Sequence, residues 1–120
     1  MPAGEVDGVP VYWADAPGDL VGLLTFRVGV ADESLLSHGV SHLVEHLALA
    51  DERLRDLPHN GEVTATTTTF STRGRPEEVA EVLTLVAAGL ADLPFDRIPT
   101  ESRILATEAL GRSGVPGMLA

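Results

Sequence analysis

Two histidines and one glutamate stand at the positions of this sequence best suited to metal-assisted chemistry. His42 and His46 are four residues apart, and Glu45 directly precedes the second histidine. On a helix, residues four apart lie about one turn apart on the same face, so both imidazoles can bind one metal ion. Glu45 then lies beside that ion, where a carboxylate can act as a general base toward water. The spacing therefore predicts a metal-binding helix that also carries a base.

A catalytic zinc site needs a third protein ligand and one open position. The sequence has no cysteine, so this ligand must be a histidine or a carboxylate. His38 continues the histidine series, but three successive turns of a straight helix cannot all converge on one ion. His59 lies in an expected turn, while Glu101 and Glu108 are seven residues apart and so share one face of a helix. Spacing alone leaves His59 and the two glutamates as candidates.

Composition and charge exclude several classes of partner. The 120 residues include 18 acidic and 8 basic side chains, which gives a formal net charge of −10, and all the basic residues are arginine. A chain without a basic patch lacks the positive charge that binds nucleic acids and anionic membranes. We expect neither as a partner. Because the sequence shows no secretory signal and no membrane-spanning apolar stretch, we expect a cytoplasmic protein.

The hydrophobic pattern predicts strands and helices in an order that is not a βαβ repeat. Strands are expected over residues 9–13, 20–30 and 63–73, the last of these as one strand or two, and helices over residues 37–49, 77–92 and 99–110. Gly39 falls inside the first helix and suggests close packing there. The length fits one domain over residues 1–120. The order indicates an α+β fold, with an antiparallel or mixed sheet and helices packed on one face.

These residues resemble the insulinase/pitrilysin family of zinc metallopeptidases, which includes the mitochondrial processing peptidases. The H-x-x-E-H order is the inverse of the commoner zinc-peptidase motif, and a helix with two glutamates seven apart follows it at a distance. Further segments are similar to the family's first strand, its second strand with an acidic turn, the entry to its metal helix and its substrate edge: residues 8–11, 28–33, 39–42 and 60–65. The resemblance covers most of the chain.

The resemblance implies the roles of five residues. His42, His46 and Glu108 would bind Zn²⁺, and Glu45 would be the general base. Glu101 would be a neighbouring carboxylate that helps to hold the site.

The resemblance also implies a substrate edge and a partner. Residues Val63, Thr64 and Ala65 would form the exposed strand edge that binds an extended peptide, although Thr64 replaces the asparagine usual in the family. The interval between His46 and Glu108 is shorter than is usual. Family members are several times longer, so the chain would correspond to the N-terminal part of a catalytic domain. A second peptidase-like domain, or a homo- or hetero-oligomeric partner, would then complete the substrate site.

We therefore expect a zinc-dependent endopeptidase that hydrolyses unstructured peptides. The intact Glu45 favours this activity over a degenerate site. One alternative is a non-catalytic peptidase-like subunit or binding module that needs a partner chain. Another is a structural zinc domain, which has no open coordination position and loses its stability on chelation.

Overall fold

The computed structural model describes residues 1–113. Its strands are β1 (Ala3–Val6), β2 (Val9–Tyr12), β3 (Leu20–Phe26), β4 (Asn60–Val63) and β5 (Thr68–Gly74). Its α-helices are α1 (Val40–Ala48), α2 (Pro76–Ala91) and α3 (Ile98–Ser113). Short 3₁₀ turns, η1 (Val30–Asp32), η2 (Glu52–Leu54) and η3 (Phe95–Arg97), lie between them.

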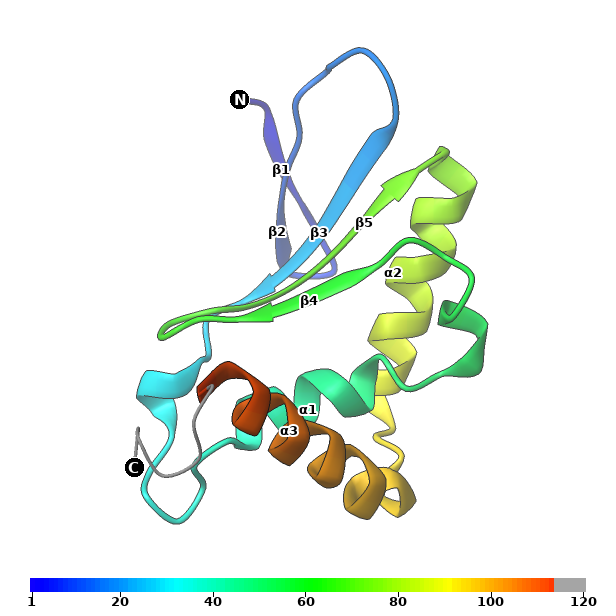
Figure 1. The fold of residues 1–120 in the computed structure, drawn as a ribbon. Coiled ribbons are helices and arrows are strands. Elements are labelled where there is room, and N and C mark those ends of the chain that lie inside the picture. Colours follow the sequence, from blue (N-terminus) through cyan, green and yellow to red (C-terminus); the bar gives the residue numbers. More distant parts are fainter. Residues whose placement is uncertain (114–120) are drawn as a thin grey trace.

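The predicted α+β architecture is confirmed. Strands β3, β5 and β4 form an antiparallel sheet in that order, and β1 and β2 form a separate hairpin (Figure 1). Helices α1 and α2 pack on one face of the three-stranded sheet, and α3 packs against α1. In the register, Phe70 of β5 lies opposite both Leu24 and Gly61, so these three residues mark the helix-covered face. The fold thereby stacks one sheet layer on one helix layer.

The core lies between the sheet and α2. Its most deeply buried side chains are Phe70, Leu54, Val82 and Val86, and Ala48 and Leu85 complete the cluster. The buried residues of α2 recur at helical spacing, as the sequence predicted, and Pro76 at its first position fits the fixed φ of proline. A close approach at Gly89 brings α1 against α2, since a Cβ there would lie 2.8 Å from the carbonyl oxygen of Ala48.

The predicted strand over residues 20–30 is too long. β3 ends at Phe26. Beyond it the chain leaves the sheet, and the Val30 N–H donates to the carbonyl of Thr64 at 3.0 Å. Gly29 makes this crossing feasible because a Cβ at position 29 would overlap the backbone of Thr64. A tertiary hydrogen bond thus overrides a hydrophobic alternation that continues past the end of the strand.

The threonine-rich stretch over residues 63–73 forms a hairpin rather than one strand. Thr64 N donates to the carbonyl of Thr67 at 2.8 Å, and the Thr64 hydroxyl accepts from Thr67 N at 3.0 Å. Short hydroxyl side chains that bond to nearby backbone groups favour such turns. The sequence prediction also missed β1, although Asp7 and Gly8, both with positive φ, form the tight turn typical of a two-residue hairpin.

Two helix boundaries differ from the prediction by more than one residue. α1 begins at Val40, because Gly39 is its N-cap with φ of 88°, in the left-handed region that favours glycine. The expectation of close packing at Gly39 is wrong, since a Cβ there would meet no atom within 4 Å. α3 continues past the predicted end at residue 110 to Ser113, so Gly111 does not terminate it. None of the helices within residues 1–113 is long and apolar enough to cross a membrane.

Candidate metal centre

The helix that carries both histidines is held at its start by a side chain from the preceding loop. Glu33 accepts the backbone N–H of Gly39 through Oε1 and that of Ser41 through Oε2, each at 2.8 Å. These bonds satisfy two amide groups that the first turn of α1 leaves without partners inside the helix. They hold the pKa of Glu33 below its ordinary value, the bond from Gly39 having the larger effect. Glu33 therefore fixes the direction in which α1 enters the site.

His42, His46 and Glu108 lie together between α1 and α3. One ligand atom from each of the three side chains lies within 4.8 Å of those of the other two, so the group could hold a metal ion. His46 Nε2 and Glu108 Oε2 lie 3.6 Å apart. Ligands about 2.05 Å from a tetrahedral zinc ion are about 3.3 Å apart, so small side-chain movements would bring the group to that geometry. The two imidazole rings lie edge to face, with their centroids 5.1 Å apart.

Glu45 is buried beside this group with one oxygen unsatisfied. Its Oε2 lies 3.8 Å from His42 Nε2 and 3.6 Å from His46 Nε2, yet has no hydrogen-bond partner among the described residues. Burial raises the pKa of Glu45; the two histidines oppose this rise, and Glu108 adds to it. A buried carboxylate oxygen normally has a partner. A water molecule at a metal ion held by the three side chains would supply one, so this arrangement fits a metal ion with a bound water.

Glu101 lies beside Nδ1 of His46, the ring nitrogen that points away from Glu108. The Glu101 side chain is 8% exposed, and its Oε1 lies 3.3 Å from His46 Nδ1. Its other oxygen, Oε2, accepts a hydrogen bond from Arg97 at 2.9 Å. The family resemblance implied a place for Glu101 beside the ligands, whereas Arg97 was not predicted. The spacing of four residues between a basic and an acidic side chain at a helix start was the available signal.

Strand β4 brings its backbone close to Glu45. A Cβ added to Gly61 would overlap Glu45 Oε1 and lie 2.8 Å from Glu45 Cγ and Cδ. β4 is also the last strand of its sheet, so within residues 1–113 its outer side pairs with no strand. Sequence reasoning missed Gly61, whose φ is not positive. Only the tertiary contact explains the need for a small residue there.

The predicted substrate segment divides between the strand and its turn. Val63 is the last residue of β4, while Thr64 and Ala65 lie beyond it. Their carbonyl oxygens accept hydrogen bonds from the N–H groups of Val30 and Ala31, at 3.0 and 2.8 Å. The unpaired edge near the metal centre is therefore Asn60–Val63.

The remaining two histidines lie outside the cluster. His38 is exposed and lies 3.9 Å from Glu33. His59 Nδ1 lies 2.7 Å from the carbonyl oxygen of Leu57. Neither belongs to the group that could hold a metal ion, so the structure favours Glu108 over His59 as the third ligand.

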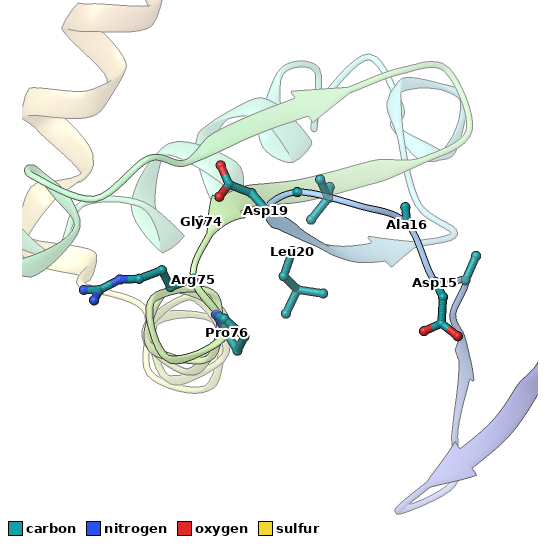
Figure 2. Close-up of a pocket in the computed structure, with 10 residues that line it drawn as sticks. Asp15, Ala16, Asp19, Leu20, Gly74, Arg75 and Pro76 are labelled. Atoms are coloured by element: carbon teal, nitrogen blue, oxygen red, sulfur yellow. The ribbon is translucent and has the colours of Figure 1, made fainter.

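Two hollows help to delimit the site. One of about 310 Å³ opens directly beside the metal centre, lined by Glu45, His46, Leu49, Ala50, Arg97 and Glu101. Another, of about 380 Å³, lies between residues 14–21 and the start of α2. There Arg75 extends away from Asp15 and Asp19 (Figure 2), and no histidine lines the walls. The first hollow is the one in contact with candidate catalytic groups.

Comparison with known proteins gave no match: no protein-family model, no curated protein and no solved structure matches the chain. The geometry shows a group of two imidazoles and one carboxylate that could hold a metal ion, with a buried carboxylate beside it.

Proposed function

We propose that this protein is a zinc-dependent endopeptidase of the insulinase/pitrilysin type, acting on unstructured peptides in the cytoplasm. The single observation that carries the proposal is the unsatisfied Oε2 of Glu45, buried beside His42, His46 and Glu108. In a structural metal site, protein ligands fill all the coordination positions, so a buried carboxylate beside the ion would have no bound water to act on.

We propose zinc as the metal because the ligand types favour it. Two imidazoles and one carboxylate are the ligands of a known class of catalytic zinc sites, in which water takes the fourth position. A set of oxygen ligands would instead favour magnesium or calcium. The second nitrogen of His46 faces Glu101, as is usual for a metal-binding histidine whose other ring nitrogen donates to a carboxylate.

The protein's own groups suit peptide hydrolysis. Bound zinc would supply a Lewis acid that activates water and polarises the scissile carbonyl. Glu45 takes a proton from the attacking water and returns it to the leaving amine. The pKa of Glu45, raised by burial, makes its carboxylate a stronger base than an exposed glutamate. Glu101 holds the imidazole of His46 in place during both transfers.

The substrate would bind along β4. An extended peptide can add to an unpaired strand edge through backbone hydrogen bonds that do not depend on its sequence. Gly61 places that edge against Glu45, so a peptide bond lying along Asn60–Val63 would lie close to the base. Val63, Thr64 and Ala65 would then guide one end of the peptide past the hairpin.

Substitution of the base tests this proposal directly. The chain loaded with zinc should hydrolyse an unstructured fluorogenic peptide, and a chelator should stop the reaction. Glu45→Gln should retain one equivalent of zinc while turnover falls by roughly 10²–10⁴-fold. Normal hydrolysis by this variant would contradict the assignment of Glu45. Inactivity of the wild-type chain in every oligomeric form, together with unfolding on chelation, would favour a structural zinc domain.

A second candidate function is a peptidase-like subunit that requires a partner chain. The observation that favours it is the apolar surface that strand β3 and its surroundings expose. Val21 and Leu23 of the sheet-edge strand β3 are 55% and 61% exposed, and an apolar hollow of about 320 Å³ opens beside Phe26 and Val40. Exposed apolar patches commonly mark interfaces.

The mass of the protein in solution separates the two candidates. An active monomer on gel filtration would support the self-sufficient enzyme. A chain that is inert alone and becomes active with a companion subunit would support the partner-dependent form. A chain that binds zinc and unstructured peptide, but hydrolyses nothing with any partner, would support a binding module.

A further inference from the structure

Arg97 is bonded to the carboxylate that faces His46. It closes η3, directly before α3, and its guanidinium Nη2 donates to Glu101 Oε2 at 2.9 Å. The Arg97 side chain is 44% exposed, whereas that of Glu101 is 8% exposed. The contact therefore joins a partly solvated cation to a buried anion, a setting in which a charged hydrogen bond is stronger than on an open surface.

The two oxygens of Glu101 have separate partners. Oε1 lies 3.3 Å from His46 Nδ1, and Oε2 is bonded to Arg97. A carboxylate held at one oxygen cannot rotate without breaking that bond, so Arg97 determines where the other oxygen points. This orientation favours the form of His46 that carries its proton on Nδ1 and leaves Nε2 as a metal ligand.

The charges around the site strengthen this effect. Glu45, Glu101 and Glu108 surround the two histidines, in a chain of formal net charge −10. Arg97 forms an ion pair with Glu101, one member of this acidic group. Its positive charge lowers the mutual repulsion of the three carboxylates, and so keeps Glu101 close to the ring.

We propose that Arg97 is a positioning residue of the metal centre, which acts through Glu101 to orient His46 for zinc. The proposal rests on the metal site proposed above and adds a residue that the H-x-x-E-H motif does not contain. Arg97 is bonded to Glu101, and Glu101 faces His46, so the proposed effect passes through the Arg97–Glu101–His46 series of contacts.

Zinc affinity measured with a competing chromophoric chelator tests this series. Arg97→Met removes the charge and the donors while keeping most of the length, and it should weaken zinc binding by roughly tenfold, the lower end of the range for such outer groups. Arg97→Lys keeps the charge and should recover part of the loss. The matched control is Arg103→Met, a substitution at an exposed position of α3 outside the cluster, which should leave the affinity unchanged.

A double-mutant cycle distinguishes positioning from a general effect of charge. If Arg97 acts through Glu101, Arg97→Met should have little further effect on zinc affinity in a Glu101→Gln background. An equal loss in both backgrounds, or no loss in either, would overturn the proposal. If the wild-type chain binds no zinc, the proposed metal site itself is wrong. If the wild type binds zinc and the Arg97 variants bind it equally well, only the proposed role of Arg97 is wrong.

A second measurement needs neither zinc nor peptidase activity. Nitrogen-15 spectra of the imidazole side chains of the metal-free chain report which nitrogen of His46 carries the proton. The wild type should have it on Nδ1, and Arg97→Met should show a mixture of both forms. An unchanged His46 spectrum in this variant would rule out orientation through Glu101.

Discussion

Gly61 of β4 lies directly against the carboxylate of Glu45 on α1, and the contact leaves no room for a side chain at position 61. A Cβ there would overlap Glu45 Oε1, and it would lie 2.8 Å from Cγ and Cδ of the same side chain. Glu45 is buried, so it cannot swing freely into solvent to make space. The place of the Glu45 carboxylate therefore depends on the absence of a side chain at position 61 of a different element.

We predict that Gly61→Ala displaces Glu45 and impairs turnover more than metal binding. A misplacement of about 1 Å in a catalytic group can lower the rate by roughly 10²-fold, while the ligands on α1 and α3 keep their positions. Peptidase kcat and zinc affinity should be measured on the same preparation. The matched control is Gly111→Ala on α3, where an added Cβ meets no atom within 4 Å. Equal kcat for both variants would contradict the steric role of Gly61.

The sequence predicted which residues form the candidate metal-binding group better than it predicted the contacts around them. His42, Glu45 and His46 share one helix, and Glu101 and Glu108 share another, so their spacing is a local property that a helical period reveals. The meeting of the two helices followed only from the family resemblance. Local periodicity does not determine how distant elements pack.

The supporting residues were missed because their roles arise from tertiary contacts. Gly61 has an ordinary backbone conformation. A small residue is required there because Glu45, on a helix much earlier in the chain, packs against it. Glu33 seemed to be part of an acidic turn, yet its carboxylate caps a helix that starts after a loop. The strand predicted over residues 20–30 failed for the same reason, since the Val30 N–H bonds to the β4–β5 turn instead of continuing a ladder.

We predict that Glu33→Gln destabilises the fold near about pH 7 but has little effect in acid. The folded-state pKa of Glu33 is lowered, mainly by the Gly39 N–H bond, from an ordinary value of 4.5. The ionised carboxylate therefore stabilises the folded state fully above pH 4.5, and this contribution is lost as the pH falls through the lower folded-state pKa. Thermal unfolding midpoints across this range measure the difference between wild type and variant.

The control for the Glu33 experiment is Glu62→Gln. Glu62 is an exposed residue of β4, so this substitution removes the same charge without removing a helix cap. Its unfolding midpoint should stay close to that of the wild type. A pH-independent difference between wild type and Glu33→Gln would show that the ionised carboxylate is not the stabilising group.

We predict that His46→Ala removes tight metal binding and that His38→Ala does not. His46 presents Nε2 toward Glu108, whereas His38 lies outside the group that could hold an ion. Loss of groups outside the ligand set typically lowers metal affinity 10–100-fold, so loss of a direct ligand should exceed about a hundredfold. Competition with a chromophoric chelator gives both affinities. One equivalent of zinc bound by His46→Ala with unchanged affinity would require a different set of ligands.

We predict that metal binding stabilises the packing of the second half of α3 against α1. After the buried Glu101, nearly all residues of this helix up to Gly111 are exposed, so few apolar contacts hold that part. An ion shared by His42, His46 and Glu108 would join the two helices at a point close to the C-terminal end of α3. Local opening of such a segment is governed by the number of its stabilising contacts, and a ligand that binds the closed form suppresses the opening.

Hydrogen exchange read by mass spectrometry measures how often this part of α3 opens. Zinc should slow amide exchange in peptides from the second half of α3, and a chelator should reverse the effect. Glu108→Gln should lose most of the protection there, because its neutral amide is a poor zinc ligand. Peptides from α2, which contributes no residue to the ligand group and is held by the buried core, should exchange alike in all samples. Equal protection of α3 with and without zinc would mean that Glu108 does not join the helices through the ion.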